Sequence, residues 1–103
     1  MSFSAKQEFR IPRHIVQPSG VNIEAISANK TLTYRDSQYQ RLDAQSGGLE
    51  CILPDEKDGA MFVINAQGNA ITVKDGAGNT IKALSLGEGG MFCCDGTNWK
   101  QFL

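Results

Sequence analysis

Histidine, the side chain that most often acts as a general base, occurs once in this chain of 103 residues. His14 is the only histidine, and it follows Pro12 in a segment that we expect to lie outside the rigid part of the fold. A serine or cysteine hydrolase needs a base held beside its nucleophile, and the sequence has no Gly-x-Ser-x-Gly turn to present one. We expect His14 to make an ordinary polar contact, and we expect no catalytic residues.

Carboxylates gather once, in the segment 55–59, which reads Asp-Glu-Lys-Asp-Gly. The segment follows Pro54 and ends in Asp-Gly, which is the composition of a loop. A calcium loop needs acids at alternate positions, and Lys57 occupies one of them. A glycosidase needs two carboxylates about 5 to 10 Å apart across one groove, and the scattered acids indicate no such pair. We predict a solvated turn without a metal ion.

The three cysteines, Cys51, Cys93 and Cys94, indicate structural thiols. An odd number with two adjacent members does not fit the disulfide framework of a small secreted protein, and a vicinal disulfide would be strained. A zinc site needs about four ligands with characteristic spacing, which the distant His14 does not supply. Because neighbours in a strand point to opposite faces, one of Cys93 and Cys94 should enter the core while the other faces a rim or a partner.

Glycine clusters occur between apolar segments, where they predict turns. Neither Gly76-x-Gly78 nor the cluster 87–90 completes Gly-x-Gly-x-x-Gly ahead of a helix, so we expect no nucleotide and no other cofactor. Asp95-Gly96 is a hairpin signal that should pair the last two strands. Gly68-Asn69-x-Ile recurs ten residues later, which fits consecutive antiparallel strands and is too little for a solenoid.

The charge and hydropathy of the chain argue against nucleic-acid and membrane partners. Ten Lys and Arg against eleven Asp and Glu give a net charge of −1, which disfavours binding to a phosphate backbone. No apolar run approaches the roughly 20 residues that span a bilayer, and residues 1–10 lack the apolar stretch of a signal peptide. We expect a soluble protein made in a cytoplasm, with no nucleic-acid or membrane partner and no small-molecule substrate.

The body of the chain, residues 21–103, is predicted to be all-β. Apolar residues recur there with period two or in short runs, and no long window has helical spacing. Nine short strands need two sheets or a barrel, and we predict a small antiparallel β-sandwich, jelly-roll-like. The segment 61–64 should lie near its middle because it is apolar on both faces. The predicted strands are 21–27, 30–35, 39–44, 49–53, 61–65, 70–74, 80–86, 91–94 and 98–102.

Residues 1–20 are predicted to form an extended N-terminal arm. Pro12 and Pro18 interrupt any regular ladder, and three basic residues against one acid give the segment a charge of +2, leaving −3 on the body. A frayed terminus is the alternative. The segment contains too many apolar residues for a solvated tail, namely Phe3, Phe9, Ile11, Ile15 and Val16. We therefore favour an arm that docks on another subunit or protein.

The half of the chain from Leu49 to Phe102 has a characteristic order of motifs. A strand ending in Leu53-Pro54 leads to an acidic turn closed by Gly59, then to a Met-Phe-Val-Ile-Asn strand, an Ile-x-Val strand and a terminal Asp-Gly-x-x-Trp hairpin that ends at Trp99. This order resembles that of bacteriophage virion proteins, namely capsid decoration (cement) proteins and fibre modules. The segment 31–37 is similar to what precedes the Leu-Pro strand in such modules, whereas 38–42 departs from it.

The resemblance implies a structural protein of the virion, made in the host cytoplasm. A small β-sandwich or jelly-roll subunit would form a homotrimer on the outside of a capsid and bridge neighbouring major capsid proteins. In that setting the side chains of Phe3, Phe9 and Ile11 would anchor the arm, while Arg10 and Arg13 would steer it toward acidic patches on the capsid.

Two other functions remain open from the sequence. A tail or head fibre module could bind a host glycan through an exposed aromatic ring, for which Trp99 and Tyr39 are the candidates. Trp99 can equally pack in the core or at a subunit contact. An enzyme acting on cell-wall carbohydrate is disfavoured because no carboxylate pair is evident.

Overall fold

The computed structural model describes residues 18 and 20–103, and in this part of the chain every regular element is a strand. The segments predicted as strands are confirmed as strands, with differences at their ends. The strands are β1 (Val21–Ile26), β2 (Lys30–Thr31), β3 (Tyr39–Ala44), β4 (Leu49–Ile52), β5 (Met61–Gln67), β6 (Ile71–Lys74), β7 (Thr80–Leu84), β8 (Gly89–Cys94) and β9 (Trp99–Gln101).

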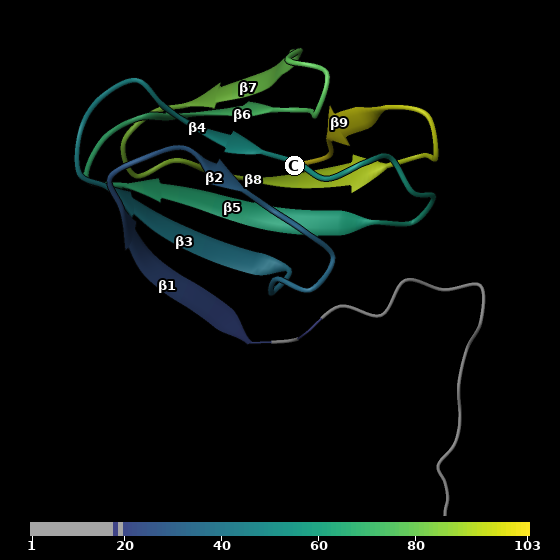
Figure 1. Ribbon diagram of the computed structural model, residues 1–103, viewed down its shortest axis with the longest axis horizontal. Helices are drawn as coiled ribbons and strands as arrows, with labels where there is room; N and C mark the ends of the chain where they lie inside the picture. Colours follow the sequence, from purple (N-terminus) through teal and green to yellow (C-terminus); the bar gives the residue numbers. More distant parts are fainter. Residues whose placement is uncertain (1–17, 19) are drawn as a thin grey trace, which may run out of the picture.

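The strands form two sheets; in Figure 1, β4, β6 and β7 of one sheet lie above β1, β3, β5 and β8 of the other. The large sheet has the order β1-β3-β5-β8-β9, and the small sheet has the order β2-β4-β6-β7. Pairings among β1 to β6 are all parallel, whereas β5 with β8, β6 with β7, and β8 with β9 are antiparallel. The prediction of an antiparallel, jelly-roll-like sandwich was therefore wrong in its strand pairing: the fold is all-β with two mixed sheets.

Parallel pairing arises because the chain alternates between the sheets from β1 to β6. Each return to the large sheet places a new strand beside the previous one in the same direction, so that Val21 lies opposite Tyr39, 18 residues later, and Tyr39 lies opposite Val63, 24 residues later. The path is thus a coil with a strand of each sheet in every turn. The antiparallel strands β7 to β9 then complete both sheets at one end of this coil.

Side-chain hydrogen bonds in turns shorten one predicted strand and form the predicted hairpin. The second predicted strand stops at Thr31 because the backbone turns at 33–36, where the Asp36 carboxylate accepts a hydrogen bond of 2.8 Å from the Thr33 amide. The predicted Asp-Gly hairpin is confirmed: β8 and β9 pair, and the Asp95 carboxylate accepts bonds from the Thr97 and Asn98 amides at 2.9 and 2.8 Å. Side-chain oxygens commonly fix turns in this way.

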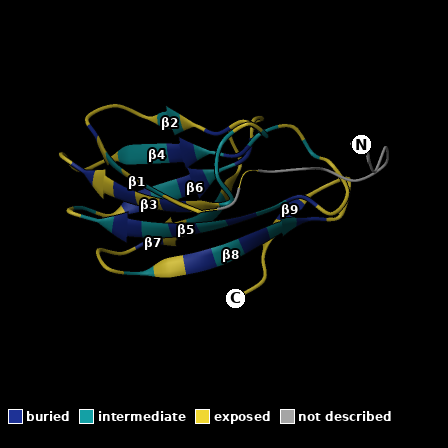
Figure 2. Cartoon of the chain, turned by 90° about the horizontal axis from the view of Figure 1, so that it is seen from below, coloured by how far each residue is buried: buried dark blue, intermediate teal, exposed yellow. Residues whose placement is uncertain are grey.

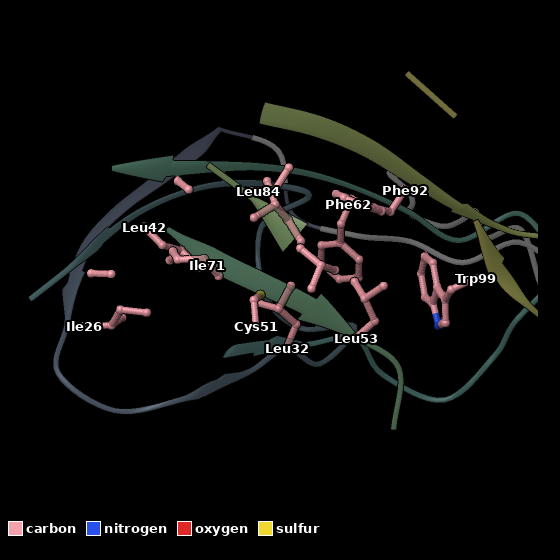
Figure 3. Packing of buried hydrophobic residues seen from close by; sticks show 14 of the residues in the cluster. Ile26, Leu32, Leu42, Cys51, Leu53, Phe62, Ile71, Leu84, Phe92 and Trp99 are labelled. Carbon is pink, nitrogen blue, oxygen red and sulfur yellow. The ribbon is translucent and has the colours of Figure 1, made fainter. Parts of the chain in front are cut away.

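The core lies between the two sheets, and Figure 3 shows its side chains converging from both. Phe62 on β5 and Phe92 on β8 lie opposite each other in register and are fully buried. The Phe62 ring lies 6.0 Å from that of Trp99, whose indole nitrogen donates a hydrogen bond of 2.8 Å to the Pro54 carbonyl oxygen. This bond satisfies the one polar atom of a buried indole. The prediction that 61–64 lies near the middle is confirmed, since β5 is the central strand of the large sheet.

Polar side chains close the core at the β1 end of the coil. Glu24 on β1 forms a 2.9 Å ion pair with Lys30 on β2, which joins the two sheets. Beside it, the Asn22 amide donates to the buried side chain of Gln40 at 2.8 Å. The Asn22 and Lys30 hydrogen bonds hold the pKa of Glu24 below its ordinary value. Charged groups that face inward at an outer strand discourage another strand from adding there.

Asp75 fixes the turn between β6 and β7. Its carboxylate accepts hydrogen bonds from the Ala77 amide at 3.0 Å and from the amide and side chain of Asn79 at 2.8 and 3.0 Å. These bonds, the one from the Asn79 side chain first, lower the pKa of Asp75 below its ordinary value of 3.8. The charged carboxylate therefore stabilises the fold above that ordinary pKa, and this contribution disappears as the pH falls through the lowered one.

Replacing Asp75 by asparagine should accordingly destabilise the protein by about 1 kcal/mol near neutral pH. The difference from the wild type should shrink as the pH falls below 3.8 and through the lowered pKa of Asp75, because the wild-type carboxylate then takes up its proton. Urea unfolding of both proteins at neutral and acid pH measures this. Equal differences at both pH values would contradict the assignment.

Candidate functional site

The outer face of the large sheet carries a row of apolar side chains. The strand registers place Val21, Tyr39, Val63 and Met91 side by side on β1, β3, β5 and β8. Buried neighbours such as Gln40 and Leu42 alternate with the outward residues of β3, so Tyr39 points away from the core. Together with Ile23, Met61 and Cys93, which lie on the same face, these residues form what we name the apolar face.

Several side chains of the apolar face are strongly exposed. Val21 exposes 61% of its surface, Ile23 exposes 71% and Tyr39 exposes 39%. Exposed residues alternate with half-buried or buried ones along β1 and β3, and Figure 2 colours the whole chain by burial. Single exposed apolar residues are ordinary, but a contiguous set across several strands is the usual mark of an interaction surface.

The small sheet presents a different outer face. Glu50 on β4 and Lys74 on β6 point outward there and form an ion pair of 2.8 Å, with Thr72 opposite Glu50 in the strand register. In the described part of the chain, none of the strongly exposed large apolar residues lies on β2, β4, β6 or β7, so this face offers little apolar surface for a partner to cover. The two outer faces of the molecule thus differ in chemistry, and the apolar one belongs to the large sheet.

A shallow hollow of about 240 Å³ extends the apolar face at the hairpin of β8 and β9. Its walls include Cys93, Lys100 and Phe102, and Phe102 is held beside β8 by a hydrogen bond of 2.6 Å from its amide to the Met91 carbonyl oxygen. Phe102 itself exposes 68% of its surface. The hollow has room for an apolar side chain from another molecule.

Two side chains of opposite charge lie next to the apolar residues, on strand β3 and on the outer face of the large sheet. Arg41 and Asp43 point outward from β3 and line a second hollow together with Ile23. Among the residues that the structure describes, neither side chain forms an ion pair or a side-chain hydrogen bond. An arginine and an aspartate that remain unpaired at an apolar surface are available to a partner.

Of the predicted site residues, one lies on the apolar face, one lies in the core, and the others lie outside the described residues. Tyr39 lies within the apolar face, whereas Trp99 exposes only 3% of its surface and packs in the core, so its ring is not open to a ligand here. His14 and the partner-binding residues predicted in the arm lie outside the described residues. The predicted arm residues are Phe3, Phe9, Arg10, Ile11 and Arg13. Five residues of the apolar face are not predicted as site residues from the sequence, because only the strand register brings them to one face. These residues are Val21, Ile23, Met61, Val63 and Met91.

The cysteines are free thiols in different environments. Burial raises the pKa of Cys51 to about 12, which makes it an inert core residue. The prediction for the adjacent pair is confirmed, since Cys94 is buried and Cys93 lies half-buried on the apolar face. Within residues 18 and 20–103, no group of His, Cys, Asp and Glu side chains is arranged to hold a metal ion. The segment 55–59 is an exposed turn, as predicted.

Comparison of the chain with protein-family models, with curated proteins and with solved structures finds no match. In the described residues, no helix is long and apolar enough to cross a membrane.

Proposed function

We propose that this protein is a structural component of a bacteriophage virion that decorates the outside of the capsid. A homotrimer made in the host cytoplasm would bridge neighbouring major capsid proteins and hold them together by contact, without catalysis. The observation that carries the proposal is the apolar face of the large sheet, where Ile23 exposes 71% of its surface. An apolar surface of this kind suits a protein that works by binding other chains.

Mechanical stabilisation is a task for which several moderate contacts suffice. A trimer attaches through three equivalent sites, and linked sites raise the overall affinity by about 10² to 10⁴ without any exceptional single contact. A shell packed with DNA is under outward pressure, so a bridge between neighbouring capsid subunits opposes their separation. The order of motifs from Leu49 to Phe102, which resembles that of phage decoration proteins, supports this task.

The arm at residues 1–20 is proposed to lengthen each attachment. Its apolar residues Phe3, Phe9 and Ile11 supply anchors, and Arg10 and Arg13 supply a positive charge opposite in sign to that of the body. An extended segment can add to a sheet edge or lie along a groove of its partner. The arm precedes β1, which begins at Val21 at the border of the apolar face.

Deleting residues 2–16 tests the role of the arm. We expect at least about a hundredfold weaker binding to undecorated capsids of the phage that encodes this chain, since several anchors are lost together. The urea midpoint of the deletion variant should stay close to that of the full chain. Replacing only Arg10 and Arg13 by alanine should slow association and reduce its dependence on salt. Undiminished capsid binding by the deletion variant would refute the arm's role.

A glycan-binding fibre module is the alternative function, and the exposed ring of Tyr39 is the observation in its favour. Titration with host-surface glycans separates the two. Saturable binding that Tyr39→Ala abolishes would favour the fibre module, whereas binding to capsids without glycan binding favours decoration.

A further inference from the structure

We propose that copies of this chain contact one another through the apolar face, with the same face of each copy turned toward the symmetry axis of the oligomer. This inference rests on the self-association in the proposed function, but not on attachment to a capsid. It assigns the contact to Val21, Ile23, Tyr39, Val63 and Met91, with Arg41 and Asp43 beside them.

The two faces of the molecule point to this assignment first. The outer face of the small sheet is satisfied by its own ion pair between Glu50 and Lys74. The apolar face offers β-branched and aromatic side chains to solvent instead, and burying such side chains gains roughly 25 cal/mol for each Å² of apolar surface removed from water. A second copy that covers Ile23 and Val21, exposed at 71% and 61%, removes two of the most exposed apolar side chains from water.

Charge complementarity indicates that the occupant is another copy of the same chain. Arg41 and Asp43 are separated by one residue on β3 and point the same way, which puts them about 7 Å apart. Because both charges lie on the face turned toward the symmetry axis, the arginine of each copy can lie against the aspartate of the next copy around that axis. The face therefore carries its own counter-charges, and both groups lack a partner among the described residues.

The sheet edge at β1 is a weaker route to self-association. Glu24 and Lys30 face inward at that end and are joined by a 2.9 Å ion pair. A strand added beside β1 by another copy would have to cover this pair and the polar contact between Asn22 and Gln40. Inward charges at an outer strand act against such pairing, which leaves the apolar face as the larger favourable surface.

Substitution of Ile23 by lysine tests the assignment, with Leu86→Lys as the matched control. Both side chains are apolar and similarly exposed, at 71% and 62%, but Leu86 lies in the turn after β7, outside the apolar face. Analytical ultracentrifugation of the full chain should give three copies per particle in the micromolar range. We expect Ile23→Lys to raise the dissociation constant at least about tenfold, because an ammonium group would be desolvated, and Leu86→Lys to leave it unchanged.

Charge reversal supplies a second test that a folding defect cannot imitate. Arg41→Asp and Asp43→Arg should each weaken self-association, because like charges then meet across the contact. The double variant restores opposite charges and should recover most of the wild-type affinity. Cys93 gives an independent readout, since its thiol lies on the apolar face: labelling should slow as the protein concentration rises, and more so in the wild type than in Ile23→Lys.

A wild type that remains monomeric would overturn the proposal, and so would equal weakening by Leu86→Lys. A chain that associates only after residues 2–16 are deleted would also overturn it, because the N-terminal segment would then be the occupant of the apolar face. All these measurements use purified protein without capsids. A self-associating protein that ignores capsids would refute the proposed function and leave this assignment standing.

Discussion

Replacing Phe62 by alanine should lower the free energy of unfolding by about 3 to 5 kcal/mol. Phe62 lies on the central strand of the large sheet and is fully buried. Its ring contacts those of Tyr34 and Trp99, at centroid distances of 6.3 and 6.0 Å. Removing it leaves a cavity between the sheets, because the close-packed neighbours can relax only in part. The free energy of unfolding of a domain of this size is commonly about 5 to 15 kcal/mol, so this substitution would remove a large fraction of it.

Urea unfolding followed by tryptophan fluorescence measures the effect, since Trp99 reports directly on this cluster. Leu86→Ala is the control: Leu86 exposes 62% of its surface in a turn, and its truncation should change the free energy of unfolding by less than about 0.5 kcal/mol. A Phe62→Ala protein as stable as this control would contradict the packing of the core.

Replacing Gly68 by alanine should lower the free energy of unfolding by about 2 to 4 kcal/mol. Gly68 has a φ of +75°, and a Cβ atom there would lie 2.5 Å from the Ala44 carbonyl oxygen. The backbone that links β5 to β6 passes the end of β3 at this point, where the Asn69 side chain donates a 2.9 Å hydrogen bond to the same oxygen. A methyl group would force the two segments apart, in addition to the cost of a left-handed conformation.

Gly78→Ala separates these two contributions. Gly78 has a φ of +92°, but a Cβ atom added there would meet no other atom within 4 Å, so alanine should cost only the roughly 1 to 2 kcal/mol of the backbone conformation. Thermal or urea unfolding of both variants gives the comparison. Equal losses would show that the close approach of Gly68 to β3 contributes nothing to stability.

The strands could be predicted from the sequence because alternation and turn residues are local signals. The Asp95 hairpin, the central place of 61–64 and the opposite facing of Cys93 and Cys94 all follow from neighbours in the chain. Parallel pairing is not a local property. It depends on the chain changing sheets after each strand, and strands such as Ile71–Lys74 show the same alternation in either direction of pairing.

The coil was missed for a related reason. Its turns place partners 18 residues apart at Val21 and Tyr39 but 24 apart at Tyr39 and Val63, because the loops between the sheets differ in length. A sequence with unequal spacing has no detectable repeat, although its backbone repeats. The apolar face is not predictable from the sequence for the same reason. Its residues are far apart in the chain and come together only through the parallel register, so the sequence points to Tyr39 alone among its exposed apolar residues.

On the proposed function, this protein works by binding other protein chains on the surface of a capsid. Cryo-electron microscopy of capsids from the phage that encodes it, lacking this chain and then mixed with the purified protein, tests that claim most directly. We predict stoichiometric density on the outer surface at three-fold or quasi-three-fold positions, bridging neighbouring capsid subunits. Bare capsids at saturating protein, or density confined to the tail, would contradict it.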